Sequence, residues 1–224
     1  LGHVRKKKVI VKVLRLKHYI YIMKICGYQW LTLIFTVFFT YGTYASTILF
    51  YASGDNNLSK RLLSDLIEIK SATISQNDKL LIQLDFDSSD RSFVRSAKRA
   101  ELPKDIYKNT TRLEFNSGTV GINFSEINVK IVDGEPNMDS VATFLDFLQW
   151  RKSKAEGKDI SLIMWNHGHS ILGFGGDEQN GTIKIPNHLT QESIKTALQI
   201  AKLKLDFLAF DTCLLGSINT FLQF

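Results

Sequence analysis

The chain has 224 residues, of which 28 are basic and 22 acidic, giving a formal net charge of +6. Residues 1–45 contain eight of the basic side chains and none of the acidic ones, which leaves 20 basic against 22 acidic residues beyond them. Residues 46–224 are therefore close to neutral, and the overall charge gives no indication that they bind nucleic acid. The length is sufficient for one sizeable core but hardly for two domains.

The first 45 residues have the profile of an export signal. A lysine follows Met23, residues 30–39 are largely apolar, and Ala45 stands where a signal peptidase would cut. We therefore expect a leader over residues 1–45 and a secreted or cell-surface protein. The alternative is a membrane anchor, because no charged residue occurs from residue 25 to residue 54, and about 20 apolar residues span a bilayer.

Strand and helix signals alternate beyond the leader. We expect a strand at residues 46–52, a turn with a helix cap at 54–57, and a helix at 58–69, where apolar residues recur at helical spacing. The turn and the N-cap account for Asp55. A second strand is expected at residues 79–85.

The next stretch, residues 87–121, is polar and irregular in pattern. Two runs, 111–115 and 119–124, are compatible with a hairpin outside the main sheet. The alternation then returns, with an amphipathic helix at 140–150, a strand at 159–166, a helix at 190–203 capped by Thr190, and a strand at 205–210. Strands that alternate with helices predict an α/β fold with a parallel sheet covered on both faces.

Two of these strands lead to side chains with useful chemistry. The strand at 159–166 runs into His167, and the strand at 205–210 leads through Asp211 to Cys213. In open α/β sheets, the reacting groups lie beyond the carboxyl ends of the strands. A histidine and a cysteine at the same sheet edge form a candidate dyad, in which the imidazole takes the thiol proton and later protonates a leaving amine.

Less specific interpretations of these residues stay open. A lone cysteine after an apolar strand can be an inert core thiol, and a lone histidine can be structural. Cys26 lies in the leader, so Cys213 has no disulfide partner in the mature chain. His167, His169 and Cys213 offer ligand types that zinc prefers, but no convincing fourth ligand accompanies them, so no metal site is expected there. His169 is interpreted as a loop residue.

Four segments of the sequence resemble the clostripain family of cysteine peptidases, which shares a caspase-like sandwich with caspases, gingipains and legumains. In chain order they are the first strand with the turn to residue 58, residues 134–150, residues 164–168 and residues 205–217. The resemblance covers most of residues 46–224. It implies a caspase-like α/β/α sandwich with a mostly parallel central sheet, incomplete at the C-terminus.

The resemblance also implies roles for single residues. His167 would be the general base and acid and Cys213 the nucleophile, with backbone N–H groups of Gly168 and Cys213 stabilising the oxyanion. An acidic residue at the position of Asp211 lies at the floor of the primary specificity pocket in the family. We expect that carboxylate to be partly buried on the same side as Cys213, where it would bind the side chain of an Arg or Lys substrate. The alternative for Asp211 is a helix cap.

The expected function is that of a secreted cysteine endopeptidase that cuts polypeptides after Arg or Lys. Polypeptide substrates are the expected partners, a membrane only if the leader is retained, and the sequence does not indicate an oligomeric state. No cofactor is expected. Calcium dependence is known within the family, but no loop here has recognisable calcium-ligand spacing, and Asp177 and Glu178 are expected to face solvent.

The sequence departs from the family pattern at several points. Asn166 stands where an Asp often precedes the catalytic histidine, and His169 and Ser170 replace glycines. The chain stops 11 residues after Cys213, whereas the family continues with further strands and one wall of the substrate cleft. The chain as given is therefore expected to be a fragment. An inactive truncated homologue, or a surface binding protein that retains the fold, is the alternative function.

Overall fold

The structure is a computed structural model. It describes residues 46–75, 77–115, 123–124, 127–154, 159–169, 172–177, 188–213 and 215. The leader expected over residues 1–45 lies outside the described residues, so the export signal and the membrane anchor both stay predictions. Among the helices that the structure describes, none is both long and apolar enough to cross a membrane.

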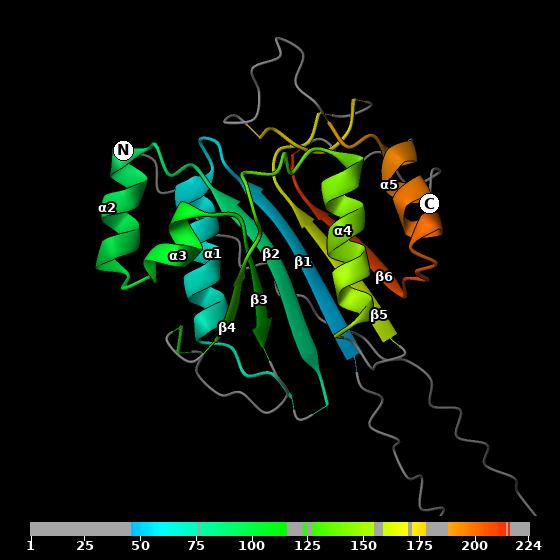
Figure 1. Ribbon diagram of the computed structural model, residues 1–224, viewed down its shortest axis with the longest axis horizontal. Helices are drawn as coiled ribbons and strands as arrows, with labels where there is room; N and C mark the ends of the chain where they lie inside the picture. The colour runs from blue at the N-terminus through cyan, green and yellow to red at the C-terminus, as the bar shows by residue number, and fades with distance from the viewer. Residues whose placement is uncertain are drawn as a thin grey trace, which may run out of the picture. The chain divides into compact units, whose positions relative to one another are not determined.

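A six-stranded sheet forms the centre of the described chain, in the order β4-β3-β2-β1-β5-β6 (Figure 1). Four neighbouring strands run parallel: β2 (Lys79–Phe86), β1 (Ser46–Gly54), β5 (Asp159–Trp165) and β6 (Phe207–Asp211). β3 (Thr111–Phe115) and β4 (Asn128–Ile131) are antiparallel and complete the sheet beside β2. The fold is therefore mostly parallel, as the alternation of strands and helices predicts.

Helices cover both faces of this sheet (Figure 1). On one face lie α1 (Ser59–Lys70), α2 (Arg91–Arg99) and α3 (Lys104–Lys108), and on the other lie α4 (Val141–Lys152) and α5 (Gln191–Ile200). Alternate residues of β1 enter different cores, because side chains along a strand point to opposite faces. Phe50 and Ala52 pack with α1, α2 and α3, whereas Leu49 and Tyr51 pack with α4 and α5.

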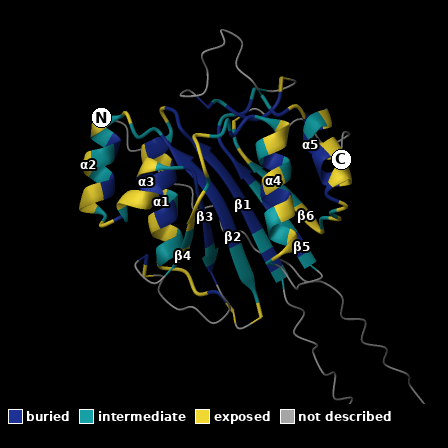
Figure 2. Ribbon diagram, viewed as in Figure 1, coloured by how far each residue is buried: buried dark blue, intermediate teal, exposed yellow. Residues whose placement is uncertain are grey.

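The central strands are buried along most of their length, as Figure 2 shows by their dark colour. Such strands cannot alternate between apolar and polar residues, because both faces are covered, so they have nearly continuous apolar sequences. This explains why residues 46–52 and 79–85 are recognisable as strands. The cap predicted at Thr190 is confirmed, since Thr190 Oγ1 accepts a hydrogen bond from Ser193 N at 3.1 Å. The helix expected from residue 140 also begins at a cap, with Ser140 Oγ accepting from Thr143 N at 3.1 Å.

The prediction for residues 87–121 is wrong in two respects. This stretch contains α2 and α3, and β3 pairs with β2 in the main sheet instead of forming a separate hairpin. The second strand of the expected hairpin, residues 119–124, lies largely outside the described residues, and on its other side β3 pairs with β4. α2 has few apolar residues, and those that it buries are Phe93 and Ala97, so its sequence gives a short apolar pattern.

Asp55 does not have the capping role predicted for it. α1 has Leu58 at its N-cap, without a side-chain hydrogen bond there, and Asp55 is fully buried just beyond the end of β1. The turn is instead held by Asn56, whose Oδ1 accepts a hydrogen bond from Leu58 N at 2.8 Å. The buried position of Asp55 next to the carboxyl ends of the strands calls for a different explanation.

Candidate active site

Strands β5 and β6 lie side by side and deliver the two candidate catalytic residues to one edge of the sheet. Trp165 pairs with Asp211 in parallel register, and His167 and Cys213 each follow two residues later. A Cβ atom on Gly168 would lie 2.0 Å from the carbonyl oxygen of Cys213. Glycine is therefore the residue that fits here, since the backbone after the histidine packs directly on the backbone at the cysteine.

The ring of His167 is oriented by a neighbour from another loop. Its Nε2 lies 2.7 Å from Oδ1 of Asn57, which belongs to the turn between β1 and α1. An amide oxygen only accepts hydrogen bonds, so Nε2 carries the proton in this contact and Nδ1 is the basic nitrogen of the neutral ring. The sequence indicated a turn at Asn57 but not this contact. The one available signal was a polar side chain just beyond the carboxyl end of a central strand.

Asn166 links the loops around the candidate site through hydrogen bonds. It is buried, and its Oδ1 accepts hydrogen bonds from Asn56 Nδ2 at 2.9 Å and from the backbone N–H of His167 at 2.6 Å. Asn56 Nδ2 also donates to the carbonyl oxygen of Gly176 at 2.7 Å. Both bonds to Asn166 use an acceptor oxygen that an aspartate would supply equally. The replacement at residue 166 therefore preserves this network.

The backbone at Gly168 lies in a folded-back loop that packs on the backbone of Cys213. The chain folds back after His167, with hydrogen bonds from His169 N to Gly173 O at 2.9 Å and from Gly175 N to His167 O at 3.1 Å. These bonds are made by the residues on either side of Gly168. A backbone donor beside the candidate nucleophile is the arrangement that stabilises a developing negative charge on a carbonyl oxygen.

Cys213 carries a free, exposed thiol. Asp211 is also exposed, so the partial burial expected for its carboxylate is not found. The reason is its position on β6, which is the outermost strand of the sheet that the structure describes. The helix-cap alternative for Asp211 concerns residues from 214 onward, which lie almost entirely outside the described residues.

A second carboxyl group lies near Asp211 on the side of α1. Asp65 accepts a hydrogen bond from Trp165 Nε1 at 2.8 Å. Burial raises the pKa of Asp65, the hydrogen bond from Trp165 opposes this rise, and the negative charge of Asp211 adds to it. Asp211 and Asp65 thus lie close enough to interact electrostatically, and the positive charge of Arg61 opposes the rise in the pKa of Asp65.

His169 lies in the loop, as interpreted from the sequence. Its Nε2 is 3.2 Å from the carbonyl oxygen of Gly175, and its ring stacks on His188 with the centroids 4.1 Å apart. Burial, assisted by the charge of His169, lowers the pKa of His188. These contacts of His169 hold the loop after His167 in place.

The prediction that Asp177 faces solvent is wrong, and Glu178 lies outside the described residues. Asp177 is buried, and its Oδ2 accepts a hydrogen bond from Met138 N at 2.7 Å. Asp139 makes the reciprocal contact, because its Oδ2 accepts hydrogen bonds from the N–H groups of Gly176 and Asp177 at 2.7 and 2.9 Å. Burial raises the pKa of Asp139 to about 7, against the effect of these two hydrogen bonds. The two acids join the segment before α4 to the loop that follows His167.

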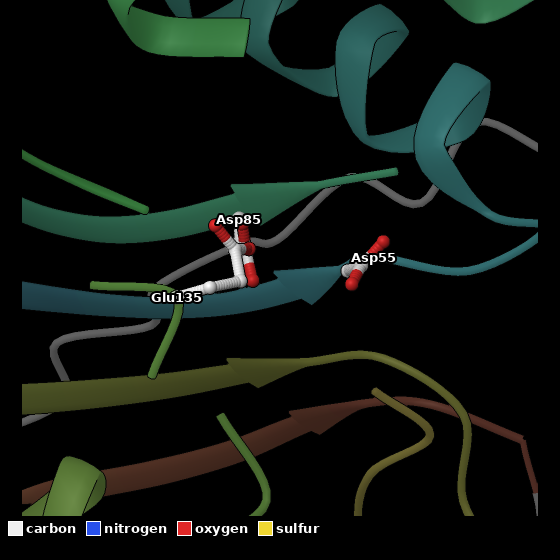
Figure 3. A group of neighbouring side chains, drawn as sticks. All are labelled: Asp55, Asp85 and Glu135. Carbon is white, nitrogen blue, oxygen red and sulfur yellow. The ribbon is translucent and has the colours of Figure 1, made fainter. Parts of the chain in front are cut away.

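Three further carboxyl groups, from Asp55, Asp85 and Glu135, meet at the carboxyl ends of β1 and β2 (Figure 3). One oxygen of each lies within 4.8 Å of the others. Among the described residues, this is the group with the ligand types and the spacing to hold a metal ion. Sequence reasoning missed it, because its members come from three separate segments.

A mostly parallel α/β sandwich with a histidine and a cysteine beyond the ends of neighbouring strands has the architecture of the caspase-like peptidases. The chain belongs to the clostripain family, peptidase family C11, because the family's sequence profile matches residues 50–224.

Comparison with individual proteins agrees with this assignment. Clostripain from Hathewaya histolytica is 26% identical over 202 residues, which cover 80% of this chain and 35% of that protein. A secreted C11 cysteine protease from Bacteroides thetaiotaomicron, solved with an irreversible peptide inhibitor, matches with a TM-score of 0.57 and 19% identity over 80% of this chain and 46% of that one.

An inactive zymogen C11 protease from Parabacteroides distasonis matches with a TM-score of 0.52 and 18% identity, over 77% of this chain and 43% of that one. At these identities the solved structures show the fold. The chain spans 35% of the curated relative's length and less than half of either solved chain.

Proposed function

We propose that this chain carries the catalytic histidine and cysteine of a cysteine endopeptidase that cuts polypeptides after Arg or Lys. One observation is the main support for this proposal. The parallel register of β5 and β6 brings His167 and Cys213 to the same edge of the sheet, and Gly168 packs on the backbone of Cys213. Membership of the clostripain family supports assigning peptidase chemistry to this pair.

In the proposed mechanism, Nδ1 of His167 accepts the thiol proton and Sγ of Cys213 attacks the scissile carbonyl carbon. The N–H groups of Gly168 and Cys213 donate to the oxyanion. The imidazolium then protonates the leaving amine, and water hydrolyses the thioester to release the acid and restore the thiol. Asn57 holds Nε2–H throughout and keeps the ring in the tautomer that the first step needs. No organic cofactor takes part.

The preference for basic residues follows from Asp211, the residue that ends β6 two positions before the nucleophile. Its carboxylate is exposed and has Asp65 near it, so a cationic substrate side chain entering here meets negative charge. A guanidinium or ammonium group would be attracted to this place more strongly than a neutral side chain. This supports cleavage after Arg or Lys.

We propose secretion as well, on two grounds. The leader has the composition of an export signal, and one solved relative is described as secreted. N-terminal sequencing of the protein recovered from its native source tests this. A first residue near Ser46 supports export and cleavage, whereas recovery of residues 24–40 in the mature protein would indicate an anchor.

The peptidase proposal is tested on the full-length gene product with peptidyl-Arg and peptidyl-Lys amides. We expect hydrolysis by the unmodified protein and a loss of at least about 10³-fold in kcat/KM for Cys213→Ala and for His167→Ala. Lys195→Gln, at an exposed position on α5, is the control and should stay within about threefold. Undiminished turnover by Cys213→Ala would contradict the proposal. A folded protein without any turnover would favour a binding protein that retains the fold.

A further inference from the structure

Two histidine rings stack against each other beside the candidate active site. The ring centroids of His169 and His188 are 4.1 Å apart, with an angle of 22° between the ring planes. His169 comes two residues after the candidate catalytic histidine, whereas His188 belongs to the segment just before α5. The stack therefore connects two segments of the chain that are separate in sequence.

Backbone hydrogen bonds connect the segment of His188 to the backbone of His167. Phe174 and Leu189 exchange two bonds, at 2.9 and 2.8 Å. One residue further along, Gly175 N donates to the carbonyl oxygen of His167 at 3.1 Å. The segment 173–175 therefore has a bonded neighbour on each side, and a movement of His188 and Leu189 would reach the backbone of His167 through it.

The surroundings of the stack favour neutral rings, most clearly at His188. This residue is half-buried, and its Nδ1 is buried without a hydrogen-bond partner in the part of the chain that the structure describes. A neutral ring can leave Nδ1 unprotonated, but an imidazolium carries an N–H on both nitrogens and would bury a donor without an acceptor. His169 Nε2 lies 3.2 Å from the carbonyl oxygen of Gly175, so this nitrogen carries the proton of the neutral ring.

The two rings also act on each other through charge. Burial lowers the pKa of His188, and the charge of His169 lowers it further. Two like charges this close repel each other, and partial burial strengthens the repulsion because it lowers the local dielectric constant. A second proton on the stack is therefore opposed more strongly than the first.

Other titratable groups lie around the same loop. The ring of His167 has its centroid 6.2 Å from that of His169. Asp139 and Asp177 hold the loop at residues 176–177 through hydrogen bonds from backbone N–H groups. Among the described residues, His169 is the charged group that acts on His188.

We propose that His169 and His188 are positioning residues for His167 and Gly168, and that their stack holds this loop while at least one of the two rings is neutral. With a proton on both rings, repulsion separates them, and the segment 173–175 loses support on the side of His188. The backbone of His167 and Gly168 is then held less firmly. The inference rests on the proposed function, because it concerns the loop that carries the catalytic imidazole.

The stack is tested first without activity, on the full-length Cys213→Ala protein. His188→Phe keeps an aromatic ring in the stack and removes one of the two protonation sites. Because folding lowers the pKa of His188 below its unfolded value of 6.5, the parent should lose stability as the pH falls through this value, and His188→Phe should lose less. We expect the Tm of His188→Phe relative to the parent to be at least about 2 °C higher at a pH of about 5.5 than at a pH of about 8.

Two further variants show whether the rings act as a pair. His169→Phe should give a smaller gain of the same sign, because the burial of His188 remains. The double variant should gain less than the sum of the two single gains, because each single variant already prevents a doubly protonated stack. Leu172→Gln is the matched control, since Leu172 lies in the same loop, is 60% exposed and does not titrate. Its Tm should follow that of the parent at every pH.

The effect on the proposed reaction is measured on the active full-length protein with peptidyl-Arg amides. His188→Ala, which removes the ring, should lower kcat about fivefold with little change in KM, and His188→Phe should restore most of this loss. The acidic limb of the kcat profile should extend to lower pH in His188→Phe than in the parent. A ring that only packed would leave this limb unchanged.

Two results would overturn the inference. An equal change in Tm at every pH in His188→Phe would make the ring a packing residue alone. Strictly additive gains in the double variant would mean that the two rings do not interact. Absence of turnover by the unmodified protein would contradict the peptidase proposal instead, and the Tm measurements on Cys213→Ala would still decide whether the stack holds the loop.

Discussion

The two faces of the sheet bury different kinds of side chain. Beneath α1, α2 and α3 the core is formed by apolar side chains almost throughout. Beneath α4 and α5 an apolar core gives way, toward the carboxyl ends of the strands, to buried polar and acidic side chains: Ser53, Gln83, Asp85, Asp139 and Asp177. Buried carboxyl groups reduce stability unless they are hydrogen-bonded or neutralised. The first face is therefore explained by stability, and the second needs hydrogen bonds, protons or ions to explain it.

The largest effect should come from the apolar face. Phe93 of α2 is fully buried and stacks on Phe86 of β2, with the ring centroids 4.8 Å apart. Phe93→Ala should lower the free energy of unfolding by about 3–5 kcal/mol, through lost burial and the cavity left behind. Denaturant titration measures this, with the exposed Lys98→Ala of the same helix as control, expected within about 0.5 kcal/mol. A loss below about 1 kcal/mol for Phe93→Ala would mean that this face is loosely packed.

On the acidic face, stability should depend on pH through Asp139. Burial raises its pKa from 3.8 to about 7 in the folded chain. A carboxyl group with a raised folded pKa stabilises the fold at pH values below its unfolded pKa, and this contribution is lost as the pH rises through the folded value. In cation-free buffer, stability should fall by an amount on the order of a few kcal/mol between these pH values. Asp139→Asn keeps an acceptor oxygen for Gly176 N and Asp177 N and should flatten this dependence. An unchanged slope of Tm against pH would assign the effect to another acid.

The specificity proposal predicts an effect at the edge of the sheet. Asp211→Asn should lower kcat/KM for Arg and Lys substrates by about 10²-fold, because a substrate cation would lose its opposite charge. Substrates with a neutral residue at the same position should change by less than about threefold. Parallel assays on peptide amides that differ only at this position distinguish the effect on basic substrates from the effect on neutral ones. An equal loss on every substrate would make Asp211 a structural residue and remove the support for cleavage after basic residues.

The sequence predicts some parts of the fold and of the candidate site better than others, for physical reasons. β1, β2, β5 and β6 are recognisable because a strand covered on both faces has a continuous apolar sequence. His167 and Cys213 are recognisable for a related reason, since the end of each apolar run marks the edge of the sheet. α2 was missed because it buries few residues. The run at 111–115 was expected, but its place in the main sheet was not, because β3 pairs there with a strand far from it in sequence.

The acidic face shows the limit of sequence reasoning more clearly. Asp55, Asp85 and Glu135 lie in three segments, and each is unremarkable in its own sequence context. Their proximity depends on the register of β1 with β2 and on the path of the segment before α4. The burial of Asp177 likewise depends on its contact with Met138 N. Gly168 shows the opposite case, since the lack of space for a Cβ atom requires the glycine that the sequence has.

The smallest expected effect concerns Asn57, which contacts the imidazole of His167. Asn57→Ala removes the acceptor for His167 Nε2–H and should lower kcat about tenfold, the equivalent of about one hydrogen bond, with little change in KM. Asn57 is exposed, so stability should change by less than about 0.5 kcal/mol. Asn57→Asp keeps an acceptor oxygen and should restore most of kcat, while its charge moves the basic limb of the pH profile upward, because a nearby anion favours the imidazolium. If Asn57→Ala keeps full kcat and an unaltered pH profile, the contact does not position the ring.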